Sequence, residues 1–247
     1  MNRPTEVARC FVISLLTIGV GWTTRATAAP APQTSSSIGT LPLPSMNLTP
    51  QDSHVRIVVR VHNYAHIDTE TLLGAEAVAA RILSPAKIIT TWVYCPISKE
   101  EEDRYPICPS NWGTNAFVLN ILTPEMAARI KTPIETLGSA PAPCDEDATS
   151  CPISVMYFRI VKLAEQFSIQ SERLFGHVLA HEVGHMLGAN HSSKGIMRGE
   201  WGRDDLKLMR LSLLEFSTDQ SRLLRVALLH RAVRQERAQD PSLSASK

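Results

Sequence analysis

Hydrophobic positions in the middle of the chain follow two different periods, which predicts a domain built from both strands and helices. Residues 54–61 alternate with β-branched side chains, as a half-buried strand does. Residues 68–83 carry apolar side chains at helical spacing, and Pro85 ends that segment. Residues 87–94 are again rich in β-branched types. A strand, a helix and a strand at this spacing predict a parallel pair joined by a crossover helix.

The same reasoning predicts the later elements. Thr123-Pro124-Glu125 has the composition of a capped helix start, and Ser217-x-x-Gln220 forms a capping box. The expected elements are a strand at 115–122, a short helix from 124, a short strand at 154–157, an amphipathic helix after it, and helices at 171–187, at 204–214 and from 217 onward. The tail from Gln239 is expected to be disordered.

The N-terminal residues have the pattern of a secretory signal peptide. Arg3 and Arg9 are basic, residues 11–20 form a short apolar core, and Ala26-Thr27-Ala28 fits the cleavage pattern. We therefore expect a signal peptide at 1–28, a flexible Pro- and Ser-rich linker at 29–52, and a secreted or periplasmic mature protein; an uncleaved signal anchor is the alternative. No apolar run reaches the roughly 20 residues of a membrane span.

Four cysteines remain after residue 28: Cys95, Cys108, Cys144 and Cys151. An even number in an exported chain indicates disulfides. We favour Cys95–Cys108 and Cys144–Cys151, because each pair closes a short loop. A structural zinc held by four thiolates is the alternative, although the sequence has no C-x-x-C spacing to support it.

The candidate chemistry lies in the helix expected at 171–187. His181 and His185 are four residues apart, so both imidazoles lie on one helix face. Gly188 can end the helix in a left-handed conformation, which lets the chain return His191 as a third ligand. Three imidazoles leave one tetrahedral position of zinc open, as in catalytic sites. Glu182 points about 100° away from His181 and can still reach a water on the metal.

This stretch resembles the metzincin zinc proteases, whose signature is H-E-x-x-H-x-x-G-x-x-H followed by a methionine turn. Gly195-Ile196-Met197 matches that turn, and Ser192 after the third histidine is similar to the matrixin branch. Two features depart from the family. Five residues separate His191 from Met197, a tight loop, and no Tyr follows Met197 to act as a switch ligand.

The resemblance implies an α+β fold with a twisted, mixed and mostly parallel sheet, a backing helix, a zinc-binding helix and a small helical C-terminal subdomain. The catalytic domain would span 53–247, with an upper subdomain to about 191 and a lower one at 192–247. An antiparallel edge strand that pairs with substrate would fall at residues 137–140. Residues 29–51 contain no Cys to block the zinc in a latent form.

The expected function is therefore a zinc-dependent endopeptidase acting on protein or peptide substrates. Glu182 would be the general base, and His181, His185 and His191 would hold one catalytic Zn²⁺. The alternatives are a non-catalytic secreted binding protein with the same zinc fold, and a gluzincin-type peptidase with Glu200 or Asp204 as third ligand. A formal net charge of +1 gives no indication of a nucleic-acid partner, and we expect a monomer.

Weaker candidates surround this motif. His177 continues the histidine stripe, but about 12 Å of helix rise separates it from His185, so we expect a partly buried neighbour of the site. The acidic residues 145–147 are a weak candidate for structural Ca²⁺, and a solvated loop is the favoured interpretation. His62 and His66 have ligand-like spacing, but they fall in an expected loop and are interpreted as surface imidazoles.

Overall fold

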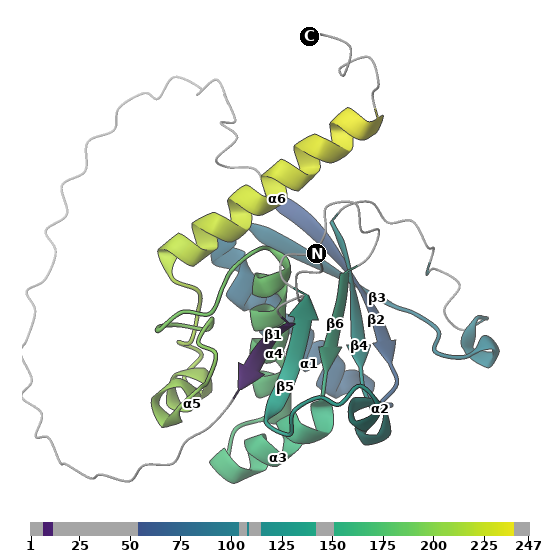
Figure 1. The fold of residues 1–247 in the computed structure, drawn as a ribbon, viewed down its shortest axis with the longest axis vertical. Coiled ribbons are helices and arrows are strands. Elements are labelled where there is room, and N and C mark those ends of the chain that lie inside the picture. Colours follow the sequence, from purple (N-terminus) through teal and green to yellow (C-terminus); the bar gives the residue numbers. More distant parts are fainter. Residues whose placement is uncertain (1–6, 12–53, 104–107, 109–114, 142–150, 240–247) are drawn as a thin grey trace, which may run out of the picture. The chain divides into compact units, whose positions relative to one another are not determined.

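The computed structural model describes residues 7–11, 54–103, 108, 115–141 and 151–239. These residues fall within one compact unit. A mixed sheet has the strand order β1-β5-β6-β4-β2-β3 (Figure 1). The strands are β1 (Val7–Phe11), β2 (Val55–Asn63), β3 (Ile88–Tyr94), β4 (Ala116–Ile121), β5 (Thr136–Pro141) and β6 (Cys151–Val155).

Most of this sheet is parallel. β2 pairs in parallel with both β3 and β4, and β4 pairs in parallel with β6. Only β5 and β1 run antiparallel to their neighbours. The first parallel pair is joined by the helix α1 (Thr69–Leu83), as the sequence pattern predicts. The predicted α+β class with a mixed, mostly parallel sheet is confirmed.

Two helices pack side by side against one face of the sheet. α1 contacts α4 (Ser171–Met186), and α4 in turn contacts β5 and β6. The two helices approach closely at Gly176, where an added Cβ would lie 2.6 Å from the carbonyl oxygen of Ala75. α4 is buried over most of its length, from Leu174 to Met186. It is therefore a core helix, and its polar residues lie inside the molecule.

Capping residues set several of the helix boundaries. Asp68 accepts a hydrogen bond from the Thr71 amide at the start of α1, and Thr123 caps α2 (Pro124–Arg129). Ser217 and Gln220 form the expected capping box at the start of α6 (Thr218–Gln239). The helix α3 (Tyr157–Phe167) follows β6 directly. These boundaries were predictable because the capping side chains are specific.

The helix expected at 204–214 is shorter than predicted. α5 spans Arg203–Arg210. Ser212 has φ +59°, and the Leu213 amide donates to the Leu208 carbonyl at 2.8 Å. This is the hydrogen-bond pattern of a Schellman ending, with serine in the position that glycine usually occupies. Because no glycine stands there, the early end of this helix could not be predicted from the sequence pattern.

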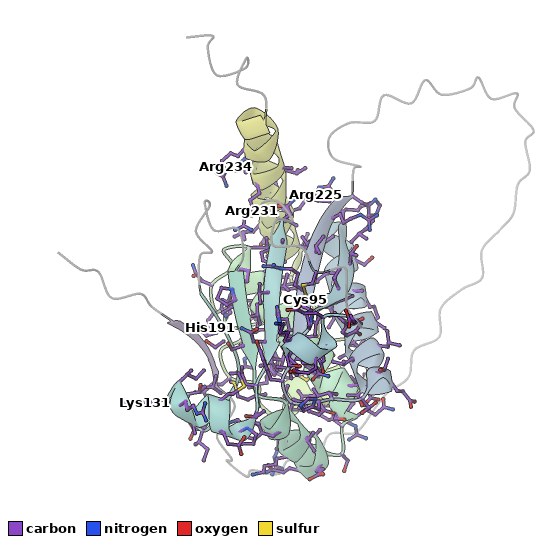
Figure 2. The ribbon with its side chains drawn as sticks, turned by 90° about the vertical axis from the view of Figure 1, so that its right-hand side faces the viewer. Cys95, Lys131, His191, Arg225, Arg231 and Arg234 are labelled. Atoms are coloured by element: carbon purple, nitrogen blue, oxygen red, sulfur yellow. A yellow bond between two sulfur atoms is a disulfide. The ribbon has the colours of Figure 1, made fainter. Side chains whose placement is uncertain are left out.

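The C-terminal helix returns over the sheet. Arg225, Arg231 and Arg234 extend from α6 (Figure 2). Arg231 is only 7% exposed, and its guanidinium lies over the Phe117 ring of β4 at 5.5 Å from the centroid. The helix expected from residue 217 onward is present, and this arginine packs inward on the same helix as the buried Leu224 and Leu228.

The strand expected at 137–140 is β5, and it has the expected antiparallel direction. Its other edge pairs with β1, with Ala8 opposite Ala140 and Arg9 opposite Ser139. β1 lies in the segment expected to be a signal peptide, and removal of that segment stays a prediction. The pairing demonstrates that the outer edge of β5 accepts an extended chain in antiparallel register.

The first expected disulfide, Cys95–Cys108, is present. The second pairing involves Cys144, which lies outside the described residues. In the described part of the chain, no helix combines the length and the apolar character that crossing a bilayer requires.

Candidate metal centre

The helix α4 ends in a way that brings three histidines together. Gly188 has φ +86°, and its amide donates to the His185 carbonyl at 2.9 Å. The next amide, of Ala189, donates to the Gly184 carbonyl at 2.9 Å. These two bonds form the Schellman motif, which reverses the chain immediately after the helix. His191 therefore returns toward the helix face that carries His181 and His185.

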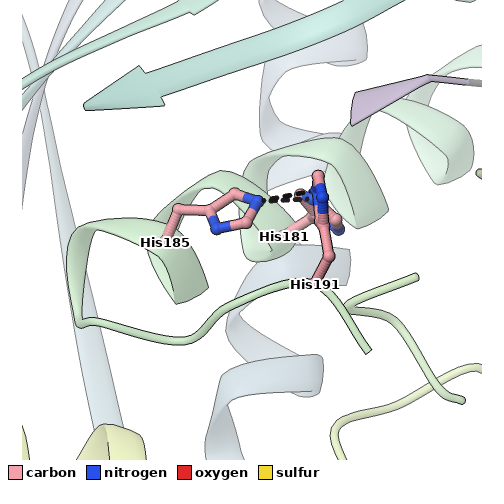
Figure 3. A group of neighbouring side chains, drawn as sticks. All are labelled: His181, His185 and His191. Carbon is pink, nitrogen blue, oxygen red and sulfur yellow. Dashed lines mark hydrogen bonds between the residues drawn. The ribbon is translucent and has the colours of Figure 1, made fainter. Parts of the chain in front are cut away.

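The three imidazoles point their Nε2 atoms at one another (Figure 3). The Nε2 atom of His185 lies 2.9 Å from that of His181 and 3.1 Å from that of His191. His181 and His185 are buried, whereas His191 is exposed. The candidate ligand atoms of the three residues lie within 4.8 Å of one another, which is compact enough for a single ion.

The opposite ring nitrogens fix the tautomers of the two helical histidines. His181 Nδ1 lies 2.7 Å from the Ile196 carbonyl, and His185 Nδ1 lies 2.8 Å from the Ala189 carbonyl. A carbonyl only accepts hydrogen bonds, so each Nδ1 carries the hydrogen and each Nε2 keeps its lone pair in a neutral ring. Lone pairs that face each other at about 3 Å repel, and a cation placed between them removes that repulsion.

Burial keeps these rings neutral. Loss of hydration lowers the pKa of His181 well below its usual range and that of His185 to about 4, and it also lowers the pKa of His191. Neutral imidazole is the form that binds a metal. Three neutral nitrogen ligands with a further position left for water suit Zn²⁺, so the residues fit the predicted metal.

Glu182 lies on the same helix and faces β5. It is fully buried, and neither carboxylate oxygen has a hydrogen-bond partner among the described residues. Desolvation raises the pKa of Glu182 well above its usual range. Burying a carboxylate without hydrogen-bond partners costs free energy. We therefore expect a polar ligand to hydrogen-bond Glu182 in the site that the three histidines form.

Gly138 of β5 makes the approach to Glu182 possible. A Cβ at this position would lie 2.5 Å from Glu182 Oε1 and 2.8 Å from its Cγ. Any side chain here would displace the carboxylate. The glycine of the edge strand therefore leaves the space that the Glu182 carboxylate fills, although residues 138 and 182 are far apart in the sequence.

The predicted methionine turn lies under the centre. Met197 is fully buried, and its sulfur would lie 2.6 Å from a Cβ added at Gly184, the residue before His185. Gly195 has φ +69°, and an added Cβ there would lie 2.8 Å from the Glu215 carbonyl. The amide of Ser192 donates to the Met197 carbonyl at 2.8 Å and closes the short loop. The turn expected at Gly195-Ile196-Met197 is therefore present, and its methionine is buried.

His177 is more buried than expected. It is 0% exposed, its Nδ1 lies 2.8 Å from the Arg173 carbonyl, and burial lowers its pKa to about 4. The prediction of a partly buried side chain was wrong because the segment after α5 folds back over this part of α4. His177 is not in the three-histidine group.

The other candidates lie away from the centre or outside the described residues. His66 is exposed and His62 stacks with Tyr64 at 6.1 Å, so both are peripheral. Glu200 and Asp204, the ligands of the gluzincin alternative, are exposed and absent from the candidate metal group. The acidic residues 145–147 lie outside the described residues, so the calcium interpretation stays untested.

Sequence reasoning missed the residues that pack around the histidines. Gly138, Gly184 and Gly199 each leave room for a site residue, and an added Cβ at Gly199 would lie 3.0 Å from His191 Nδ1. Trp201 lies edge-on to His181 with ring centroids 5.5 Å apart. No local pattern in the sequence singles these residues out, because each becomes important only through its contact with a histidine, with Glu182 or with Met197.

Comparison with known proteins gives remote similarities. No family model matches the chain, and no curated protein matches it. Among solved structures, archaemetzincin from Methanopyrus kandleri is similar with 17% identity over 74% of this chain and 99% of that chain, at a TM-score of 0.41. Metalloproteinase-II from Bacteroides fragilis is similar with 11% identity over 71% of this chain and 53% of that chain, at a TM-score of 0.44.

The fold of the described residues can be compared with the metzincin signature through its own geometry. A mixed sheet with an antiparallel strand beside the site, a helix carrying H-E-x-x-H, a glycine turn to a third histidine and a buried methionine are the parts of a metzincin-like fold. In this fold the three histidines form a candidate zinc site.

Proposed function

We propose that this protein is a zinc-dependent endopeptidase that hydrolyses peptide bonds in protein or peptide substrates. The observation that carries the proposal is the Glu182 carboxylate, which is buried without a hydrogen-bond partner in the described part of the chain, on the helix that presents His181 and His185. A scaffold that only stored metal would have no use for an unpaired carboxylate, whose burial is costly.

The residues divide the chemistry between them. His181, His185 and His191 would hold zinc through their Nε2 atoms. Bound zinc lowers the pKa of its water to about 7 and polarises a carbonyl oxygen. Glu182 accepts the proton of the attacking water and passes it to the leaving amine. Desolvation at this buried position raises the pKa of Glu182 above the usual range of a carboxyl group.

The edge of β5 is the proposed binding place for the substrate backbone. β5 passes over Glu182 at Gly138, and its outer edge already forms an antiparallel ladder with β1. An extended peptide that took the place of β1 would therefore run past Glu182. Main-chain hydrogen bonds of this kind bind peptides with little dependence on their side chains.

We also propose that the protein works outside the cytoplasm, as a secreted or periplasmic enzyme. The signal-like residues 1–28 and the Cys95–Cys108 disulfide support this compartment. If the signal segment is removed on export, β1 leaves with it and the edge of β5 is free for substrate.

Two alternatives lose support. A gluzincin-type site would need Glu200 or Asp204 as third ligand, whereas His191 occupies that place beside His181 and His185. A non-catalytic binding protein would leave the burial of Glu182 without a reason.

The test is cleavage of a diverse peptide library by the purified mature protein, with cut sites mapped by mass spectrometry. We expect cleavage that a chelator abolishes and added zinc restores. His191→Ala should lose both zinc and cleavage. Cleavage that persists in chelator, or full zinc content in His191→Ala, would contradict the proposed function.

A further inference from the structure

Trp201 lies behind the candidate metal centre and has no role in the mechanism above. Its side chain is 1% exposed, and its ring meets the His181 ring at 89° with centroids 5.5 Å apart. It follows Met197 by four residues, in the same segment that places Gly199 against His191. The segment after the methionine therefore contacts two of the three histidines.

Trp201 and His181 share one hydrogen-bond acceptor. His181 Nδ1 donates to the Ile196 carbonyl at 2.7 Å, and Trp201 Nε1 donates to the same oxygen at 3.0 Å. A carbonyl oxygen has two lone pairs, so it can accept both bonds. The two donors together fix the plane of the Ile196 peptide from both sides.

The two helical histidines differ in where their hydrogen-bond acceptors lie along the chain. The acceptor for His185 is Ala189, four residues away on the turn that ends the same helix. The acceptor for His181 is 15 residues away and belongs to the loop that also carries Met197. The orientation of the Ile196 carbonyl therefore decides whether His181 keeps its hydrogen on Nδ1 and directs Nε2 toward His185 and His191.

We propose that Trp201 is a positioning residue for the metal centre. Its indole N–H holds the Ile196 carbonyl in the orientation that sets the tautomer and direction of His181. This inference rests on the proposed function only in requiring that the three histidines bind a metal. Removing a group that hydrogen-bonds a metal ligand directly typically changes metal affinity by 10- to 100-fold. The Ile196 carbonyl is such a group for His181, and Trp201 acts on it through one further hydrogen bond.

A tryptophan of this size also stabilises the core by packing, so the test must remove the N–H and keep the shape. Site-specific replacement of Trp201 by 3-benzothienylalanine, in which sulfur takes the place of the indole N–H, does this. The matched control is the same replacement at Trp92 of β3, which is half-buried and belongs to the strand at the far edge of the sheet.

The readouts are the zinc Kd from chelator competition and the visible spectrum of the Co²⁺-substituted protein. We expect the Trp201 replacement to weaken zinc binding about tenfold or more and to change the Co²⁺ spectrum. The Trp92 replacement should change neither. Wild-type affinity and spectrum in the Trp201 variant would overturn this proposal and leave the proposed function intact. A wild-type protein that binds no zinc would contradict the proposed function, and this proposal with it.

Discussion

Glu182 of the helix and Gly138 of the edge strand lie very close together. The edge strand can lie close to the carboxylate only because position 138 has no side chain, since an added Cβ would lie 2.5 Å from Glu182 Oε1. Catalysis is sensitive to displacements of this size, and a shift of about 1 Å can lower the rate by roughly 100-fold.

Gly138→Ala should therefore lower kcat by about 10- to 100-fold while zinc content stays unchanged. The added methyl group displaces the carboxylate, because the three atoms nearest to it all belong to Glu182. Ser139→Ala is the matched control, because adjacent residues of a strand face opposite sides. Turnover by Gly138→Ala equal to that of the wild type would show that Glu182 need not hold this position.

Glu76 is a second buried carboxyl group, and it lies away from the centre on α1. It is 8% exposed, and Tyr94 donates to it at 2.7 Å. Desolvation raises its pKa from 4.5 to about 7, although the Tyr94 hydrogen bond opposes the shift. Between pH 4.5 and about pH 7, Glu76 loses its proton in the unfolded chain but keeps it in the folded protein. Stability therefore falls as the pH rises from about 4.5 to about 7.

The substitution Glu76→Gln removes this loss of stability at higher pH. The free energy of unfolding of the variant should equal that of the wild type near pH 4 and exceed it by about 1–3 kcal/mol at pH 8. Urea unfolding of both proteins across this range measures the difference. A constant difference at every pH would mean that the pKa of Glu76 is the same in the folded protein and in the unfolded chain.

The short segment from His191 to Met197 places the buried methionine beneath the histidines. Its ends are tied by the hydrogen bond from Ser192 to Met197, and the Ile196 amide donates to the Glu215 carbonyl at 3.1 Å. Arg81 pairs with Glu215 at 3.0 Å, which connects the turn to α1. The turn is therefore supported by residues from both the N-terminal and the C-terminal parts of the domain.

Met197 packs into this turn by shape, so a substitution of similar volume should be tolerated. Met197→Leu should cost less than about 1.5 kcal/mol of unfolding free energy. Met197→Glu should cost several times more, because it buries a charge against Gly184 and Phe216. Urea denaturation of the two variants checks this order, and a Met197→Glu protein as stable as the wild type would contradict the buried floor.

Local signals in the sequence predicted much of the architecture. Asp68, Thr123 and Ser217 identify helix starts because each side chain satisfies a specific amide. Gly188 identifies the end of α4 because glycine readily adopts positive φ. The three histidines and Glu182 were found because their spacing matches the period of a helix.

The remaining features depend on contacts between distant residues. Gly138 becomes meaningful only when β5 passes over Glu182, and Trp201 only when the turn presents the Ile196 carbonyl. The early end of α5 relies on Ser212 in a left-handed conformation that serine seldom adopts. No local pattern encodes these features, so they emerged only from the folded structure.

At the scale of the whole molecule, we expect the protein to hold one metal and to use Glu182 to activate water. The most direct measurement is peptide cleavage by wild-type protein and Glu182→Gln, with zinc content determined on the same samples. The amide keeps the shape of the carboxylate but cannot accept the proton. We expect both proteins to carry about one zinc per chain and the variant to lose at least about 100-fold in kcat, the lower range for removal of a general base. Equal cleavage by two equally zinc-loaded proteins would contradict the account.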